Sequence, residues 1–464
     1  MRRPNPTKAA PVAVRTALPA ALAAAALACM PPLAPALAQE GVGGDRGITG
    51  GVDLAFGVNR GASDRLETRL VADVESRTPT QVLGLSASGT FLGWGLSGDV
   101  EEDGWELADP VAGFSYAREA FDGRLEVEGS VSEDRLSFLT ATDPGIDLED
   151  PFLDPSLLSE GEGVRRDVRL SFDLVALEDL PVGVEISGAA RDTDYVGTPV
   201  GLVDPDTGDP RYVDIRTGRL DAALRLDVTP LLTTRLGFGV ERSDTGQAFR
   251  SYETRRVSVS ADYRPTERLS LEASLGAAEN VREAGEDERG LIASLGGSYE
   301  LPRGSVGFSY ARVFDNAGAR DDLSVRREID LPGGDSLGVE IGLSRTEDGE
   351  TETIGAVDYV RTGRSDELAL ALGRSVRTTV GGRSEAVTRL GAAYRRELTA
   401  RDGLSLSADY TSVGSAESGR LAVGLDRQLT RDWGLSAGVE RRLRDGSDDD
   451  AVFLTLGRRF QLGN

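Results

Sequence analysis

The chain has 464 residues, of which 52 are Lys or Arg and 77 are Asp or Glu, so its formal net charge is −25 at pH 7. It contains one Cys and no His, which excludes an internal disulfide, removes the commonest metal ligand and rules out every Ser-His or Cys-His dyad. We therefore expect no enzyme activity, no cofactor and no metal site. The excess of acidic residues also disfavours binding to nucleic-acid phosphates.

The first 38 residues form a separate segment. Basic residues at 2–15 precede an apolar run at 17–29, and Ala36-Leu37-Ala38 makes a small-residue cleavage site. The apolar run is shorter than the roughly 20 residues needed to span a bilayer. The pattern predicts a cleaved secretory signal peptide at 1–38. A lipoprotein signal ending at Cys29 is the competing interpretation.

The rest of the chain alternates between apolar and polar residues with a period of two. In 219–228 the even positions are mostly Leu, Ala and Val, whereas the odd positions carry Arg and Asp. The same pattern returns at 232–241, 257–263 and 404–410. Such alternation predicts β-strands with one apolar and one polar face. Counting the segments between about 49 and 460 gives about 22 strands, within a range of roughly 18 to 24, and 81–105 is the weakest stretch.

Two kinds of connection join these segments. Turns such as 120–123, 229–231 and 301–304 are short, whereas connections predicted at about 134–164, 192–216, 243–252, 280–288, 315–322, 346–351, 413–418 and 444–450 are longer and more charged. Short periplasmic turns alternating with longer outer loops are typical of transmembrane barrels. A soluble antiparallel protein also alternates apolar and polar residues, so a soluble periplasmic β protein remains an alternative.

Tyrosines recur at the ends of the predicted strands and share the parity of the apolar residues. Five of them precede short turns and two precede longer connections. Because an amphipathic ring favours the interface between membrane and water, they predict two aromatic girdles. The first group is Tyr116, Tyr263, Tyr299, Tyr359 and Tyr394, and the second is Tyr310 and Tyr410.

The chain ends in an alternating segment that closes on Phe460. This arrangement resembles the C-terminal strand of Gram-negative outer-membrane β-barrel proteins, although four residues follow Phe460 where the family usually stops. The resemblance covers about 48–464 and concerns architecture only. It implies an all-β fold, a single closed antiparallel transmembrane barrel at 49–464 after a short periplasmic segment at 39–48. It also implies contact with outer-membrane lipid and with the barrel assembly machinery, for which Phe460 would be part of the signal.

The polar parity of the strands predicts the residues that face the lumen. Charges of both signs there indicate a hydrated interior. The candidates are Arg219, Asp221, Arg225, Asp227, Arg235, Glu241, Arg256, Asp262, Glu272, Arg389, Asp409 and Asp426.

A barrel of this width cannot fill its bore with wall side chains, so it must either conduct or be plugged. The segment 39–48 is too short for an N-terminal plug, which disfavours a TonB-dependent receptor. The acidic connection 134–164 is either an inward-folded constriction, with Asp147, Glu149, Asp150 and Asp154 as its candidate residues, or a solvated outer loop.

Together these features predict a passive, porin-like channel for small hydrophilic solutes in the outer membrane, with a preference for cations. The alternative is a structural, surface-binding or export-associated barrel without free diffusion. The sequence makes no prediction about the oligomeric state.

Overall fold

The computed structural model describes residues 47–60, 65–94, 105–135, 164–196, 214–245, 251–282, 287–315, 318–347, 349–378, 384–414, 416–444 and 447–462. Residues Gly47–Asn464 form one compact unit. The predicted signal peptide and most of the segment 39–48 lie outside the described residues, so the domain division made from the sequence stays a prediction.

The described residues form 22 strands, and each strand pairs antiparallel with its neighbours in the chain. They are β1 (Gly47–Arg60), β2 (Arg65–Thr78), β3 (Gln81–Trp94), β4 (Trp105–Ala120), β5 (Gly123–Arg135), β6 (Val164–Ala176), β7 (Val182–Val196), β8 (Ile215–Thr229), β9 (Leu232–Asp244), β10 (Tyr252–Thr266), β11 (Leu269–Arg282), β12 (Glu288–Leu301), β13 (Gly304–Asp315), β14 (Gly318–Asp330), β15 (Ser336–Thr346), β16 (Thr351–Thr362), β17 (Asp366–Thr378), β18 (Ser384–Glu397), β19 (Asp402–Val413), β20 (Ala416–Gln428), β21 (Trp433–Arg444) and β22 (Ser447–Leu462).

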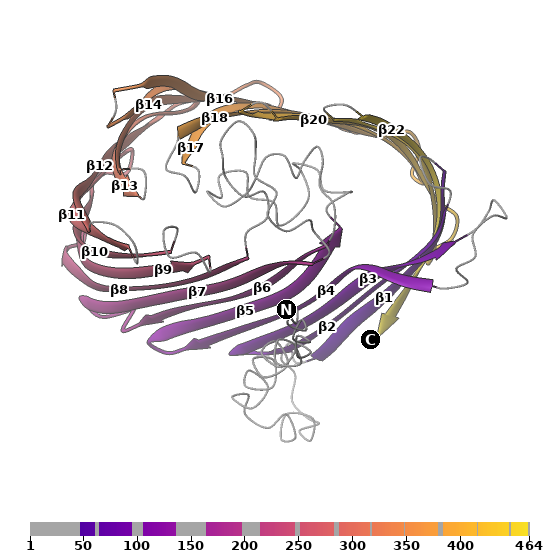
Figure 1. Ribbon diagram of the computed structural model, residues 1–464, viewed down its shortest axis with the longest axis horizontal. Coiled ribbons are helices and arrows are strands. Elements are labelled where there is room, and N and C mark those ends of the chain that lie inside the picture. The colour runs from indigo at the N-terminus through magenta and orange to yellow at the C-terminus, as the bar shows by residue number, and fades with distance from the viewer. Residues whose placement is uncertain are drawn as a thin grey trace, which may run out of the picture. The chain divides into compact units, whose positions relative to one another are not determined.

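The last strand returns to the first and closes the sheet into a barrel (Figure 1). Phe460 of β22 lies opposite Val52 of β1, and next to it the Arg459 Nε donates a hydrogen bond of 2.9 Å to the Asp53 carboxylate. Closure gives every strand a partner on both sides, which leaves no open edge. The predicted fold, one closed antiparallel barrel of about 22 strands, is confirmed.

The apolar parity of the strands is exposed. Along β8, Leu220, Leu224 and Val228 have exposed fractions of 52%, 46% and 52%. In a soluble sandwich these alternating side chains would pack into a core between two sheets. Here they form an outward apolar surface of the kind that faces lipid in transmembrane barrels. Among the described residues, no helix has the length and apolar character needed to cross a membrane.

Three aromatic rings on this outward face cover a glycine of the adjacent strand. Phe114 covers Gly129, Phe172 covers Gly188 and Phe308 covers Gly297; in each case a Cβ built on the glycine would lie within 2.7 Å of the ring. Glycine weakens a strand because it has no side chain to pack, and a cross-strand aromatic ring restores that packing. The pairing explains why these strands tolerate glycine in their interior.

The weakest stretch of the sequence pattern coincides with an irregularity between β3 and β4. The register shifts between Ser88 and Thr90, opposite Asp109, whose φ is +49°, and Pro110. Proline cannot donate a ladder hydrogen bond, so it is tolerated at such a bulge. In this stretch β3 ends at Trp94 and β4 begins at Trp105.

The connections predicted at about 315–322, 413–418 and 444–450 are shorter than expected. We call the end at which β1 begins and β22 ends the short-turn end, and the opposite end the far end. At the far end only residues 316–317, 414–415 and 445–446 separate β13 from β14, β19 from β20 and β21 from β22. Charged residues such as those at 319–322 and 448–450 continue the strands, because a strand that leaves the membrane can pair in water without an apolar face.

Substitution of an outward side chain tests which parity faces lipid. Leu224→Arg should lower the free energy of unfolding by about 2–4 kcal/mol if the residue lies near the bilayer midplane, because a charge is then placed in hydrocarbon. Ala223→Arg, one residue away on the opposite parity, is the matched control and should cost less than Leu224→Arg. Urea unfolding in phospholipid vesicles measures both; equal losses would contradict the assignment of the two faces.

A second test concerns the covered glycines. Gly188→Ala places a Cβ 2.4 Å from the Phe172 ring and should destabilise the barrel by about 1–3 kcal/mol through overpacking. Gly218 of β8 has no atom within 4 Å of its Cβ position, so Gly218→Ala should be neutral or slightly stabilising. The same unfolding assay applies. Equal effects of the two substitutions on the free energy of unfolding would show that the Phe172 ring does not pack closely over Gly188.

Candidate functional site

Nine consecutive strands line a cavity of about 880 Å³ with residues of their polar parity. Its lining runs from Asp73 on β2 to Tyr252 on β10 and includes Arg169, Arg219 and Glu241. Only the concave side of a curved sheet can bring nine strands to one cavity, so this lining is the interior wall. Three arginines and four acids stand along it, and both signs of charge are present.

A second cavity of about 600 Å³ adjoins the same wall at β5 to β10. Among its lining residues are Asp173, Glu185, Asp221 and Arg256. The Arg256 Nη2 lies 3.6 Å from Asp221 and 3.4 Å from Glu241, so one arginine bridges the acids of two neighbouring strands. Arg219 pairs with Asp221 from the other side. Four of the predicted lumen residues of β8 to β10 thus form one continuous set of ion pairs: Arg219, Asp221, Glu241 and Arg256.

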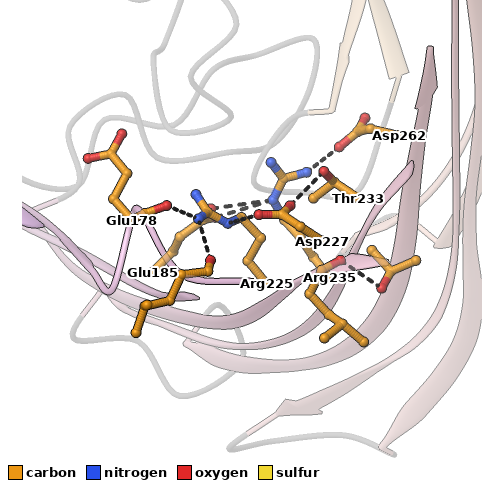
Figure 2. A network of polar contacts seen from close by, with 10 residues as sticks. Glu178, Glu185, Arg225, Asp227, Thr233, Arg235 and Asp262 are labelled. Carbon is orange, nitrogen blue, oxygen red and sulfur yellow. Dashed lines mark hydrogen bonds and ion pairs between the residues drawn. The ribbon is translucent and has the colours of Figure 1, made fainter. Parts of the chain in front are cut away.

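Closer to the short-turn end, four of the predicted residues form the network that Figure 2 shows. Arg225 pairs with Asp227 at 3.5 Å, and its guanidinium donates to the main-chain carbonyls of Glu178 and Leu180 in the turn before β7. The Thr233 hydroxyl donates to Asp227 at 2.8 Å. This side of the network ties the wall to the turn between β6 and β7.

The other side of the network centres on Arg235. Its guanidinium pairs with Asp262 of β10 and lies 3.4 Å from Glu185 of β7 (Figure 2). Arg235 therefore links strands that are not adjacent, since β8 lies between β7 and β9. Exposed pairs of this kind each contribute only about 0–1 kcal/mol to stability. Because the charges are paired with one another, few of them are left to interact with an ion in the lumen.

A band of nearly inaccessible polar side chains surrounds the wall at the far end. All its members lie on the interior parity, and their exposed fractions lie between 0% and 7%. By contrast, the Arg219 side chain in the middle of the wall is 53% exposed. We call this set the far-end polar band: Arg165, Asp167, Thr193, Ser243, Thr254, Asn280, Ser344, Arg377 and Thr411. These side chains are therefore shielded from water, unlike the charges in the middle of the wall.

Asp167 is the centre of the band on β6 and β7. Its carboxylate lies 2.8 Å from the Arg165 Nη2 and 3.0 Å from the Arg191 Nε, and it accepts a hydrogen bond of 2.6 Å from the Thr193 hydroxyl. The side chains of Asp167 and Arg165 are only 2% and 3% exposed. A carboxylate withdrawn from water in this way is stable only because it has several charged and hydrogen-bonding partners.

Farther round the barrel, the side chains of the band are either uncharged or paired with an acidic residue. Thr254 donates to the Asn280 side-chain oxygen at 2.6 Å, and the Asn280 amide donates to the Asp315 carbonyl at 2.7 Å. Arg377 pairs with Glu385 at 2.9 Å. The sequence pattern missed the band because parity shows which face a residue occupies but not how deeply it is covered.

The other predicted residues occupy separate places. Glu272 extends over Gly296 of β12, the Arg389 Nε is buried with no hydrogen-bond partner in the described part of the chain, and Asp409 and Asp426 lie on the interior parity of β19 and β20. The constriction candidates Asp147, Glu149, Asp150 and Asp154 lie outside the described residues. A role for any of these residues stays a prediction.

The predicted girdle tyrosines lie on the outward parity near the strand ends. Tyr263, Tyr299 and Tyr410 are about 40% exposed, at 42%, 40% and 38%. The hydroxyl of Tyr310 donates to Asp321 at 2.8 Å, and that of Tyr359 donates to Asp335 at 3.2 Å. Tyr116 and Tyr394 are half-buried at the same level as the other short-turn tyrosines.

Comparison with known proteins finds similarity in fold but not in sequence. No protein-family model matches the chain, and no curated protein matches it. Solved structures do match. The ferric-catecholate import receptor Fiu from E. coli K12 gives a TM-score of 0.56 at 10% identity, covering 91% of this chain and 82% of that one. The ferric enterobactin receptor PfeA from Pseudomonas aeruginosa gives 0.56 at 10%, covering 91% and 81%.

A third match is the siderophore receptor PirA from Acinetobacter baumannii, with a TM-score of 0.54 at 7% identity over 91% of this chain and 81% of that one. At such identities the likeness establishes a shared barrel fold. All three matched proteins are receptors.

The porin-like function predicted from the sequence is contradicted by these matches. The matched barrels are a ferric-catecholate import receptor, a ferric enterobactin receptor and a siderophore receptor, not passive porins. Barrel width gives the physical reason: porins that leave an aqueous channel have about 16–18 strands, whereas 22-stranded outer-membrane transporters have a plugged lumen. The charged interior wall indicated hydration, but hydration of the wall does not require an open path.

Asp167 allows a test of the far-end polar band. Asp167→Asn removes the charge that balances Arg165 and Arg191 and should lower the free energy of unfolding by about 3–5 kcal/mol, as for other broken buried pairs. The control is Glu133→Gln, which breaks an ion pair of 2.7 Å between the adjacent strands whose side chains are 32% and 51% exposed. Its loss should be about 0–1 kcal/mol. Equal losses in urea unfolding would show that the band is not withdrawn from water.

Proposed function

We propose that this chain is an outer-membrane barrel that binds a solute in its lumen and does not let solutes diffuse freely. The observation that carries the proposal is the far-end polar band, whose side chains are shielded from water although they stand on the interior wall. A barrel closed at this level can hold a ligand in the wall cavity of about 880 Å³ but cannot act as a sieve.

The similar receptors support a role in solute uptake. The charges that line the cavity indicate how the solute of this chain should differ from the ligands of those receptors. Its lining holds three arginines and four acids, and Arg169, Arg191 and Arg219 all pair with carboxylates. A strongly anionic ligand would meet no excess of positive charge. A solute with hydrogen-bonding groups and little net charge fits this wall better than a highly charged iron complex.

The location belongs to the same proposal. The outward apolar surface and the fold of the similar receptors support insertion in the outer membrane of a Gram-negative bacterium, with the short-turn end in the periplasm. We infer that the segment 1–38 directs export and is cleaved, and that the assembly machinery inserts the barrel through its last strand.

Planar-bilayer recording of the refolded mature chain tests the proposal. A barrel without free diffusion should give no steady conductance, because the closed level interrupts the water path. Steady conductance of the intact chain at all voltages would contradict the proposal.

A further inference from the structure

The outward face near the short-turn end carries arginines as well as the tyrosine girdle. Arg118, Arg361 and Arg396 each follow a girdle tyrosine by two residues, in Tyr116-Ala117-Arg118, Tyr359-Val360-Arg361 and Tyr394-Arg395-Arg396. In a strand, residues two apart point to the same face. Each of these arginines therefore lies outward, one pleat closer to the tight turn than its tyrosine, on β4, β16 and β18.

Arg427 of β20 and Arg458 of β22 also lie outward near the short-turn end. We call these two arginines, together with Arg118, Arg361 and Arg396, the belt. Arg427 shares the outward parity of Leu425, and Arg458 that of Leu456 and Phe460. Arg458 pairs in register with Trp433, the first residue of β21 after its turn, so it stands at the level of the turns and not in the middle of the barrel wall. A charge on the lipid-facing side costs least at this depth.

Carboxylates lie near two of these five arginines. Asp366 lies 3.6 Å from Arg361, and Asp402 lies 3.6 Å from Arg427. For Arg118, Arg396 and Arg458, all exposed, the described part of the chain provides no ion pair and no hydrogen-bond acceptor. Three guanidinium groups thus face outward with unused N–H donors.

Arg458 is the most constrained of the three. Its guanidinium carbon lies 5.3 Å from the centroid of the Trp433 ring and 4.5 Å from the centroid of the Phe460 ring. Two aromatic rings thus hold the guanidinium through its π system, but they accept none of its five N–H groups. Those donors remain available in the plane of the group, where they match two oxygens of a phosphate or carboxylate.

We propose that Arg458, held by Trp433 and Phe460, binds the phosphate of a membrane phospholipid in the leaflet at the short-turn end. Three observations favour this ligand: the outward parity faces lipid, the depth is that of the head groups, and the belt has an excess of positive charge that an anionic head group would neutralise. The flanking rings would lie beside the upper acyl chains. Arg118 and Arg396 provide weaker contacts of the same kind. The proposal does not depend on the solute or on closure of the lumen.

Trp433 provides the readout. The chain has three tryptophans, so replacing Trp94 and Trp105 with Phe leaves Trp433 as the only indole fluorophore. This variant, refolded as the full barrel in neutral detergent micelles, is titrated with phosphatidylglycerol. As the comparison lipid, diacylglycerol has the same chains but no phosphate. We expect phosphatidylglycerol to shift the Trp433 emission and diacylglycerol to leave it unchanged.

The arginine variants then assign the effect. Arg458→Gln should weaken the response to phosphatidylglycerol about tenfold, the effect of losing one charge-assisted contact. Arg458→Lys keeps the charge but loses the planar stacking, and should give an intermediate affinity. The matched control is Arg459→Gln on the adjacent residue, which faces the interior and pairs with Asp53, and it should bind lipid as the parent does.

Native mass spectrometry of the same variants counts retained phosphatidylglycerol and does not depend on fluorescence. Heat-modifiable migration on a gel confirms that each variant is folded. An equal response to diacylglycerol, or an unchanged affinity in folded Arg458→Gln, would overturn the proposal. Saturation of the response by inorganic phosphate alone would also overturn it, because the site would then recognise a free anion and not a lipid.

Discussion

The hydrogen-bonded closure of β22 onto β1 is the constraint on which the other features depend. In hydrocarbon an unpaired backbone N–H or C=O costs several kcal/mol, so a sheet can cross the membrane only when its two edges meet. The register across this seam places Val52 opposite Phe460 and Asp53 opposite Arg459. One pair faces outward and the other inward, so the seam already shows the division of the whole wall into an apolar outer face and a charged inner face.

The two faces of the wall are therefore stabilised by different interactions. Outside, leucine, valine and phenylalanine side chains are exposed because lipid and not protein surrounds them, and rings such as Phe172 fill the space over cross-strand glycines. Inside, charges lie on neighbouring strands a few ångströms apart and pair across them, as Arg235 does with Glu185 and Asp262. The interior wall therefore carries charges of both signs that are paired with one another across strands.

The position of a residue along its strand also determines its environment, and the alternation of apolar and polar residues does not show this effect. Mid-wall charges such as Arg219 are in contact with water, whereas Asp167 and Asn280, at the far end of the same interior face, are almost completely covered. At the short-turn end, the outward face changes from aliphatic residues to tyrosines and then to arginines. The first gradient supports the proposal of a barrel without free diffusion, and the second supports the proposal of a lipid site.

The amino-acid sequence was sufficient for the architecture, because alternation with a period of two is a local property: it identifies each strand, its outward residues and the tyrosines that end it. Strand count and closure followed from repetition of that local signal. It was not sufficient for what occupies the bore, and the porin-like interpretation was wrong for that reason. Burial of Asp167 depends on Arg165, Arg191 and Thr193 arriving from two strands, and the stacking of Arg458 depends on Trp433 lying opposite it. Such contacts arise only when the register of paired strands brings distant residues together, so the tertiary structure alone reveals them.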